Sequence, residues 1–219
     1  MNWRPDAREM PPVAGGPLGE LAARQAVEVP VRVLKTRRLV IRPLLADDRG
    51  AFLEAVRASR VELDRAHPLH EPGESDDELF DRQLALARAG DRTGKAWRRV
   101  GVRSDGVIVG AFNVNAIARG LAFEGEAAWW VRSDLGGRGL ATEGVEAMAA
   151  FALADLPEGL GLSALFAMID PGNLASLRIA DRLGFSPRPG VTAKVRVAGE
   201  WRTHEVFEVT VGTLRTGAA

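Results

Sequence analysis

The stretch that most constrains the fold is residues 126–144, where an apolar segment runs into a glycine-rich loop and then into an amphipathic segment. The short apolar run with two tryptophans predicts a buried strand. The residues after the loop predict a helix, because apolar side chains recur there at spacings of three and four. These apolar positions are Ala141, Val145, Met148, Ala149, Ala152, Leu153 and Leu156.

A strand, a glycine-rich loop and a helix N-terminus in this order form a site for an anion. The free backbone N–H groups and the positive end of the helix dipole point into the loop. Glycine has no Cβ, so a phosphate can approach the backbone closely. We therefore expect a ligand that carries phosphate at residues 136–142.

Three kinds of phosphate-binding loop compete for this stretch. A Walker loop is excluded because no Gly-Lys-Ser/Thr follows, so the lysine that reaches the terminal phosphates is missing. A dinucleotide fingerprint is a closer rival, since Gly137-Arg138-Gly139 begins its pattern. That match fails at its third glycine, where Thr142 stands, and the acidic residue Asp170 comes about thirty residues on rather than about twenty.

The third pattern, R/Q-x-x-G-x-G/A, belongs to the GNAT superfamily of N-acetyltransferases. In its RimJ/RimL-type branch of ribosomal-protein alanine acetyltransferases the loop often reads W-G-K-G-Y-A-T-E, and residues 137–143 lie on that pattern. Residues 170–185 match the family's segment P-x-N-x-A-S, ending in L-G-F, and residues 36–44 resemble its first strand. The chain thus resembles this branch over roughly residues 31 to 211. It departs at Gly136, where the family usually has Gln, Arg or Trp, and at Ala128, where it often has Gly.

The resemblance implies an α+β fold in three layers, with a mixed, mostly antiparallel central sheet and helices on both faces. Two central strands, residues 127–132 and 164–169, are expected to splay, so that the thioester arm of acetyl-CoA lies between them. The residues 59–68, a broken helical region, would wall the acceptor site. Local patterns predict a first strand at residues 31–44 and a hairpin turn at Ser104-Asp105-Gly106.

Further signals place the remaining elements. Ser75 and Glu78 form the S-x-x-E capping box that begins a helix. Asn173 is expected to begin a short helix that ends at Gly184, and residues 191–211 to form a closing hairpin. We divide the chain into an N-terminal extension, residues 1–30, and an acetyltransferase domain, residues 31–219. The extension is rich in Pro, Gly and Ala, and is either a loosely attached tail or an arm that packs on the partner in a homodimer.

Composition disfavours several classes of partner. Lys+Arg and Asp+Glu both number 29, so no net charge attracts nucleic acid or anionic lipid. The absence of cysteine excludes disulfides and cysteine-based zinc sites. No apolar run approaches the roughly 18 residues of a membrane span, and the first residues lack the apolar centre of a signal peptide. We therefore expect a cytoplasmic protein that binds neither nucleic acid nor membrane.

The resemblance also implies how acetyl-CoA, the co-substrate, is held. We expect the backbone of Trp130 and Val131 to contact it, and Asn173 to contact its pantetheine arm, although Asn173 could equally be a plain helix N-cap. The loop would bind the pyrophosphate through Gly136, Gly137, Arg138, Gly139, Leu140, Ala141 and Thr142.

Two residues are candidates for proton transfer. Glu126 matches a glutamate common in the family, and burial at the start of an apolar strand would raise its pKa toward that of a useful base. The alternative is a strand-end carboxylate that solvent screens. Many relatives use a tyrosine as the acid, but this chain has none. Ser176 matches the serine that this branch places near the coenzyme sulfur, unless it only bonds to its own helix turn.

His67, His70 and Glu71 have a metal-like spacing, but the family uses no metal and we expect no metal site. The predicted function is an acetyl-CoA-dependent N-acetyltransferase. Its acceptor is a primary amine, either a protein N-terminal α-amine or a small-molecule amine, which attacks directly in a ternary complex. The alternative is a non-catalytic acyl-CoA-binding or scaffold protein of the same fold.

Overall fold

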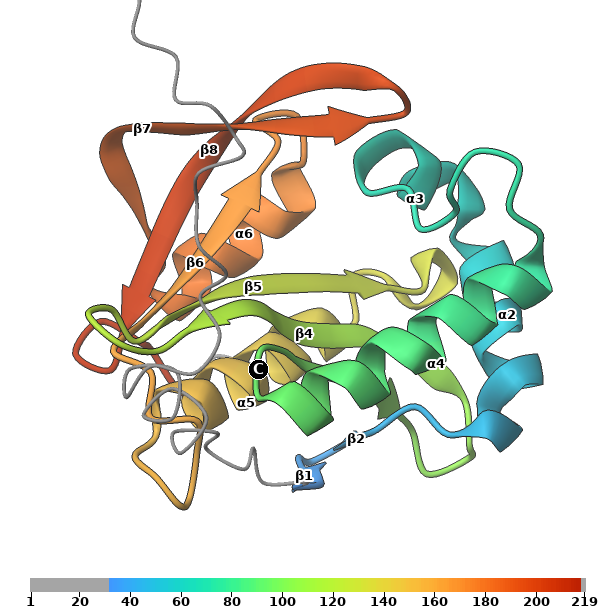
Figure 1. The fold of residues 1–219 in the computed structure, drawn as a ribbon, viewed down its shortest axis with the longest axis horizontal. Coiled ribbons are helices and arrows are strands. Elements are labelled where there is room, and N and C mark those ends of the chain that lie inside the picture. Colours follow the sequence, from blue (N-terminus) through green and yellow to red (C-terminus); the bar gives the residue numbers. More distant parts are fainter. Residues whose placement is uncertain (1–31, 218–219) are drawn as a thin grey trace, which may run out of the picture.

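The computed structural model describes residues 32–217, so the N-terminal extension predicted at residues 1–30 lies outside them. The described residues form one eight-stranded sheet in the order β1-β2-β3-β4-β5-β6-β8-β7. Helices cover both faces of this sheet (Figure 1). The strands are β1 Leu34–Lys35, β2 Val40–Arg42, β3 Trp97–Val102, β4 Ile108–Ala118, β5 Glu124–Val131, β6 Ala164–Ile169, β7 Ser186–Val197 and β8 Glu200–Thr210. The helices are α2 Arg49–Ala58, α3 Arg60–Ala66, α4 Asp76–Thr93, α5 Leu140–Leu153 and α6 Leu174–Leu183, with 3-10 turns η1 Ala46–Asp48 and η2 Ser133–Leu135.

The sheet is antiparallel except at one place, as expected of this α+β fold. Strands β1 to β5 form an antiparallel meander, and α5 then crosses over to β6, which runs parallel to β5. The hairpin β7–β8 closes the sheet by pairing β8 antiparallel to β6. The predicted α+β fold is confirmed.

Two hydrophobic clusters lie on opposite faces of the sheet, because successive side chains on a strand point to opposite sides. On β4, Phe112 and Val114 belong to the cluster under α5 and α6. Their neighbour Ala111 belongs to the cluster under α2 and α4, together with Phe52 and Trp130. Figure 1 shows α4 on the near face of the sheet and α5 on the far face.

The two central strands separate along their length. Strand β5 pairs with β4 from Glu124 to Val131, but its pairing with β6 ends at Glu126 and Phe166. Beyond this point the edge of β5 that faces β6 pairs with no strand within residues 32–217. The expected splayed pair is therefore present.

The local signals are confirmed at most element ends. Ser75 accepts from the backbone N–H of Glu78, whose carboxylate accepts from the backbone N–H of Ser75 in return. Asn173 precedes α6, and Gly184 ends it in the left-handed conformation. The hairpin turn between β3 and β4 lies where the Asp-Gly pair predicts it.

Two boundaries predicted from the sequence are wrong. The single strand expected at residues 31–44 is two short strands, because Thr36 and Arg38 turn aside to bind Glu143. Leu156, expected on the long helix, lies beyond its last residue Leu153 and is 45% exposed. The residue that follows Leu156 is a proline, which disfavours helical geometry in the residue before it.

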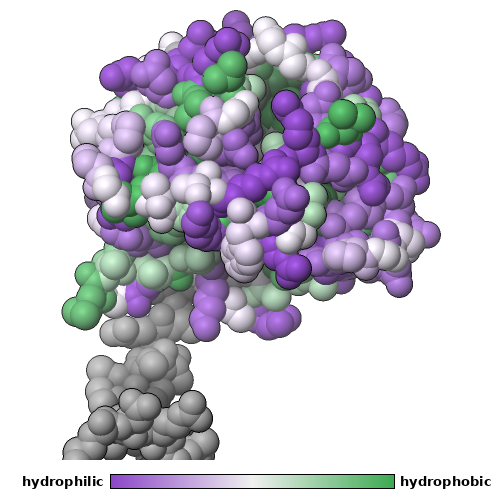
Figure 2. Space-filling model, turned by 90° about the horizontal axis from the view of Figure 1, so that it is seen from above, coloured by the Kyte–Doolittle hydropathy of each residue, from purple (hydrophilic) through white to green (hydrophobic). Residues whose placement is uncertain are grey.

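No helix within residues 32–217 is long and apolar enough to cross a membrane. Viewed from the side of the β7–β8 hairpin, the surface is mostly hydrophilic, and its apolar residues form separate small patches (Figure 2).

Candidate active site

The glycine-rich loop presents the N-terminal end of α5 to its surroundings. Gly137 and Gly139 both have φ above +70°, a conformation that side chains other than glycine rarely adopt. The amide of Glu143 donates to the carbonyl of Gly139 at 3.0 Å and so makes the first bond of the helix. The amides of Leu140, Ala141 and Thr142 precede it in the first turn and have no helical acceptor. They are free to bind an anion at this end of the helix.

A buried carboxylate fixes this loop against the edge of the sheet. Glu143, which is 5% exposed, accepts from the Thr36 hydroxyl at 2.5 Å, the Arg38 amide at 2.7 Å and Arg38 Nε at 2.6 Å. Arg38 Nη1 also donates to the carbonyl of Arg138 inside the loop, at 2.7 Å. Burial alone would raise the pKa of Glu143, but the bonds from Thr36 and Arg38 lower it below its usual value.

Close packing sets the position of α5 on the sheet. A Cβ added to Gly144 would lie 2.1 Å from the ring of Phe112, so only glycine fits there. Because Gly144 follows the loop by one helical turn, this contact fixes the distance between the helix N-terminus and the central strands.

A cavity lies where β5 and β6 separate, and the predicted catalytic residues meet there. Glu126 from β5, Asn173 from the N-cap of α6 and Ser176 from its first turn all line it. Two residues that the catalytic prediction did not include, His67 and His204, line the same cavity. Residues from four separate parts of the chain thus converge at the fork in the sheet.

The side chain of Trp130 points away from the fork. It packs on the α2 face, 6.2 Å from the ring of Phe52 between centroids. The backbone of Trp130, and not its side chain, can therefore face the gap beside β6, which is the role predicted for the backbone of Trp130 and Val131. Their contact with the coenzyme stays a prediction.

Glu126 is half-buried, and its carboxylate makes no hydrogen bond to another residue within 32–217. Burial raises the pKa of its carboxyl group above the usual value, and the positive charge of Arg98 opposes this rise. A carboxylate with a raised pKa and free lone pairs has the properties of a general base.

At α6, the hydrogen bonds show whether Asn173 caps the helix and whether Ser176 bonds only to its own helix turn. Asn173 Oδ1 accepts from the amide of Ser176 at 3.1 Å, so Asn173 is a helix N-cap. Its side-chain amide NH₂ is left over for a ligand. The Ser176 hydroxyl bonds to no residue within 32–217, and it does not use the carbonyl of its own helix turn. It is therefore available to a molecule in the cavity.

A second cavity lies between α2, α4 and the sheet, and its floor is a polar row that our sequence reasoning missed. Arg98 on β3 pairs with Asn113 on β4, and Asn115, two residues further, pairs with Glu126 on β5. Arg98, Asn113 and Asn115 line this cavity. The signal was present, because two asparagines alternate in a strand that is otherwise apolar, and that pattern puts both on one face.

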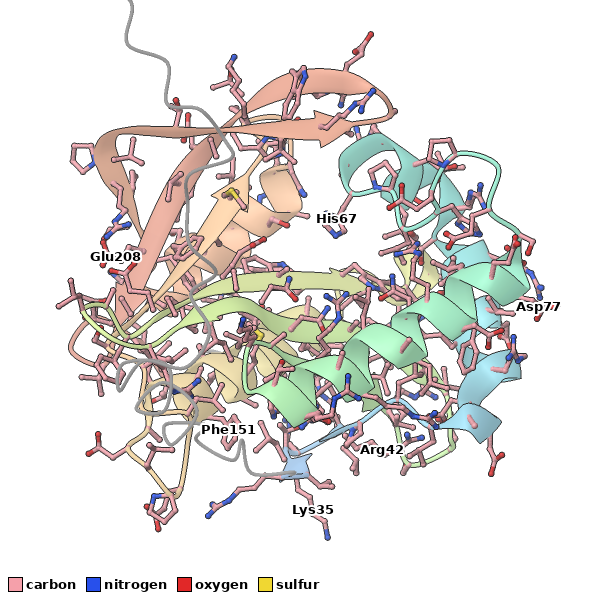
Figure 3. The ribbon with its side chains drawn as sticks, in the orientation of Figure 1. Lys35, Arg42, His67, Asp77, Phe151 and Glu208 are labelled. Atoms are coloured by element: carbon pink, nitrogen blue, oxygen red, sulfur yellow. The ribbon has the colours of Figure 1, made fainter. Side chains whose placement is uncertain are left out.

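His67 joins the two cavities. Among the residues that the structure describes, it is the only one apart from Ala128 and Trp129 of β5 that lines both. It projects from the end of α3 into the space above β5 (Figure 3). The ring is reached by solvent yet enclosed by protein, and this enclosure lowers its pKa, with further lowering from the charges of Arg98 and His204. The lowered pKa favours the neutral form of His67 at neutral pH.

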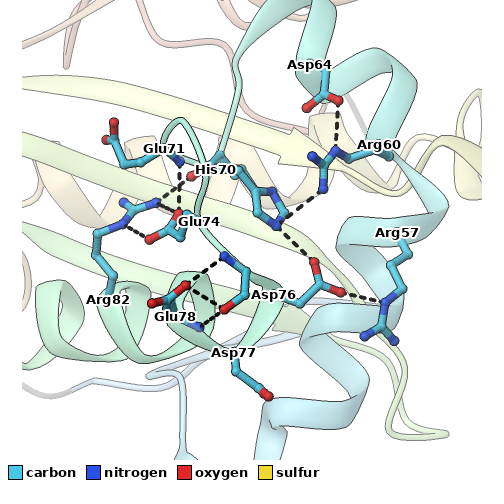
Figure 4. A network of polar contacts seen from close by, with 12 residues as sticks. Arg57, Arg60, Asp64, His70, Glu71, Glu74, Asp76, Asp77, Glu78 and Arg82 are labelled. Atoms are coloured by element: carbon cyan, nitrogen blue, oxygen red, sulfur yellow. Dashed lines mark hydrogen bonds and ion pairs between the residues drawn. The ribbon is translucent and has the colours of Figure 1, made fainter.

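Hydrogen bonds and ion pairs hold the loop that carries His67 in place (Figure 4). His70 Nε2 lies 2.9 Å from a carboxylate oxygen of Asp76, at the start of α4. Arg82 donates to the carbonyl of Leu69 at 2.6 Å and pairs with Glu74, and this pairing lowers the pKa of Glu74 to about 2. His70 is thus held by an aspartate, and no group of three potential metal ligands occurs within residues 32–217.

The hairpin β7–β8 completes the roof of the first cavity. Its tip approaches α3 in Figure 1, and Arg202 Nη1 on β8 donates to the carbonyl of Arg65 on α3 at 3.1 Å. Val195 of β7 and His204 of β8 line the cavity beneath. The site is therefore enclosed by segments from both halves of the chain.

Comparison with known proteins gives one matching family model, described as an acetyltransferase (GNAT) domain, over residues 38–186. No curated protein sequence matches the chain. Among solved structures, RimJ of Mycobacterium smegmatis in complex with CoA-disulfide is similar at a TM-score of 0.72 and 22% identity, over 82% of this chain and 85% of that one.

Two further structures show the same similarity. The ribosomal-protein-S5-alanine acetyltransferase of Vibrio fischeri has a TM-score of 0.70 and 17% identity, over 82% of this chain and 96% of that one. The microcin C7 self immunity acetyltransferase MccE, in complex with acetyl-CoA and AMP, has a TM-score of 0.70 and 13% identity, over 84% and 99%. At these identities the likeness establishes the shared fold.

Proposed function

This chain belongs to the acetyltransferase (GNAT) family and is an acetyl-CoA-dependent acetyltransferase, and we propose that its acceptor is a primary amine that attacks the thioester directly in a ternary complex. The observation that carries the proposal is the cavity at the fork between β5 and β6. A carboxylate with a raised pKa, an unbonded hydroxyl and an imidazole with a lowered pKa all line it: Glu126, Ser176 and His67.

The residues present fit acetyl-CoA as the co-substrate. The free amides of Leu140, Ala141 and Thr142 at the start of α5 suit its pyrophosphate. The unpaired edge of β5 beside Trp130 and Val131 offers backbone groups to an extended, amide-bearing arm such as pantetheine. When bound, the coenzyme supplies an acetyl group as an activated thioester.

Two residues of the cavity, Glu126 and Ser176, then have roles in the transfer. Glu126 takes a proton from the ammonium form of the amine, directly or through water, and passes it to solvent, so that the nitrogen lone pair can form a bond to the acetyl carbon. The nitrogen then loses its second proton by the same route. Backbone N–H groups on the open edge of β5 stabilise the negative charge on the acetyl oxygen. The carbon–sulfur bond breaks, and the hydroxyl of Ser176 supplies a proton to the leaving sulfur and regains one from solvent.

Some acceptors depend on the base more than others. An α-amine with a pKa near 8 is roughly one quarter neutral at pH 7.4, whereas a lysine amine is only about 0.1% neutral. The similar structures include an acetyltransferase named for ribosomal-protein alanine, which supports an N-terminal α-amine as one acceptor class. A small-molecule amine is the other. We also propose a cytoplasmic location.

The test is release of coenzyme A thiol from acetyl-CoA, measured with a panel of N-terminal peptides and small amines. Amine-dependent thiol release together with the N-acetylated product by mass spectrometry is the expected result. Saturable binding of acetyl-CoA without turnover on any amine would instead identify the non-catalytic acyl-CoA-binding alternative.

A further inference from the structure

Arg98 differs from the other arginines beside the second cavity in its hydrogen-bond partners. Arg82 pairs with the carboxylate of Glu74 at 2.6 Å, and Arg99 pairs with that of Asp91 at 2.9 Å. Arg98 has no such ion pair within residues 32–217. Its Nη1 donates to Asn115 and its Nη2 to Gln83, at 2.9 and 3.1 Å, and both acceptors are neutral amide oxygens.

These two bonds hold the guanidinium group still without neutralising it. A guanidinium has five N–H donors, so three remain after the bonds to Asn115 and Gln83. Arg98 is half-buried in the cavity wall, and a charge that is partly removed from water is costly unless a counter-charge accompanies it. The geometry is that of a pre-oriented cation that lacks its anion.

The charges around Arg98 leave this position open to an anion. Arg82 lies close enough for its positive charge to act on Arg98, and the lowered pKa of His67, which also lines the cavity, favours the neutral imidazole. Among residues 32–217, Glu126 is the only carboxylate whose negative charge acts on Arg98, in the opposite direction to Arg82, and the two form no ion pair. Glu126 lines the first cavity and Arg98 lines the second. A negative and a positive side chain therefore lie on the same sheet, one in each cavity.

We propose that the acceptor amine carries a carboxylate group, which binds to the guanidinium of Arg98. This inference rests on the proposed function and names the class of its acceptor. The amine is placed at the fork beside Glu126, while its carboxylate reaches into the second cavity. Arg98 is a specificity-determining residue in this arrangement, because a bidentate contact with carboxylate is the geometry that arginine favours.

The second cavity holds about 40 Å³, which is room for a carboxylate group and little more. Leu44, Phe52, Leu69 and Trp130 supply apolar walls opposite the polar floor. The carboxylate has two chemical sources, the α-carboxylate of a free amino acid or an acidic side chain next to the amino terminus of a peptide. Both offer the same charged oxygens at a short distance from a primary amine.

The experiment compares matched acceptors that differ only in this charge. One arm pairs free amino acids with their carboxamides, and the other pairs short peptides that have Asp or Asn at the second position. In the arm that contains the true class of acceptor, we expect the carboxylate compound to be acetylated with a kcat/KM roughly 10- to 100-fold higher than that of its amide. A difference of this size is typical of a hydrogen bond to a charged group.

The variants test whether Arg98 causes this preference. R98Q should reduce the preference to near unity by lowering kcat/KM for the carboxylate member only, and R98K should retain part of it. R92Q is the matched control, because Arg92 is an exposed arginine of α4 that does not line the cavity. Calorimetry measures the affinity of R98Q for acetyl-CoA, and an affinity equal to that of the parent shows that the variant is folded.

The outcomes separate this inference from the function on which it rests. If the parent acetylates amines but shows no carboxylate preference in either arm, or if R98Q keeps the preference, the inference is overturned and the function stands. If no amine is acetylated, the proposed function fails. The role of Arg98 can then still be tested by measuring how tightly the parent and R98Q bind N-acetylated acids and the corresponding amides. If the parent binds the acid and the amide with equal affinity, the role proposed for Arg98 is overturned.

Discussion

Glu126 has the properties of a base because of where its strand separates from the next one. It is the last residue of β5 that pairs with β6, so its carboxylate lies at the point where the cavity opens. Burial raises its pKa there, and Arg98 limits the rise. Glu124, two residues earlier on β5, also has a carboxylate, but that carboxylate lies 3.6 Å from Arg188 Nη2.

Replacing Glu126 by Gln tests the base. The amide keeps the shape but cannot take a proton, so kcat/KM should fall by roughly 10²–10⁴. The loss should be near the small end for an α-amine, which is already partly neutral, and should diminish at higher pH. The measurement is the pH–rate profile from pH 6 to 9.

The matched control is Glu124→Gln, which removes a carboxylate of the same strand that does not line the cavity. It should leave the profile unchanged. Full activity of Glu126→Gln over the whole pH range would show that solvent alone deprotonates the amine and that Glu126 has a structural role.

Ser176 is the only hydroxyl-bearing residue of the described part of the chain that lines the cavity at the fork. Its replacement by Ala should lower kcat much more than it raises the KM for acetyl-CoA, because a proton donor to the departing sulfur acts mainly in the transition state. Steady-state kinetics with varied acetyl-CoA give both constants. An unchanged kcat would remove Ser176 from this role and leave water as the proton source.

Among the elements, the turn between β1 and β2 and the start of α5 depend on one another. Glu143 accepts three hydrogen bonds from this turn, two of them from Arg38. Arg38 also donates a hydrogen bond to the carbonyl of Arg138 in the loop. The turn thus braces the helix end that would bind phosphate. The break in the predicted strand at residues 31–44 is therefore part of the site.

The lowered pKa of Glu143 makes stability depend on pH in a defined direction. A carboxyl group with a folded-state pKa below its ordinary value of 4.5 stabilises the fold fully above that value, and the stabilisation is lost as pH falls through the folded-state pKa. Glu143→Gln should cost about 1–3 kcal/mol at neutral pH, because the amide leaves Arg38 and Thr36 incompletely bonded.

Thermal unfolding from pH 7 down to pH 3 measures this. The difference in Tm between the parent and Glu143→Gln should shrink as the pH falls from 4.5 through the lowered folded-state pKa, since the parent carboxyl is protonated first in the unfolded chain and then in the folded one. The partner variant Arg38→Gln should show the same convergence. Parallel curves with a constant difference would mean that the charge of Glu143 contributes nothing to stability.

For the whole molecule, the described sheet and its two clusters contain their own hydrophobic core within residues 32–217. We therefore predict that a chain without residues 1–30 still folds and binds acetyl-CoA. Thermal melting and calorimetry of the truncated protein test this against the full chain. Failure to fold would show that the extension supplies core contacts or packs on a partner subunit.

The sequence predicted well those features that depend on short-range order. The strand at β6, the capping box at Ser75, the N-cap at Asn173 and the glycine that ends α6 were all readable, because each depends on residues within one or two turns. The glycine-rich loop was readable for the same reason. Together with the downstream motif these features identified the fold and the family.

Tertiary structure alone decided what surrounds those local features. Nothing near Glu143 in the sequence reveals its bonds to Thr36 and Arg38, more than a hundred positions away. The strand register sets Arg98 and Glu126 on one floor, and the loop after α3 brings His67 to the place where both cavities meet. Local propensity fixes which segments form. Which side chains share a cavity depends on long-range packing, which short sequence patterns do not encode.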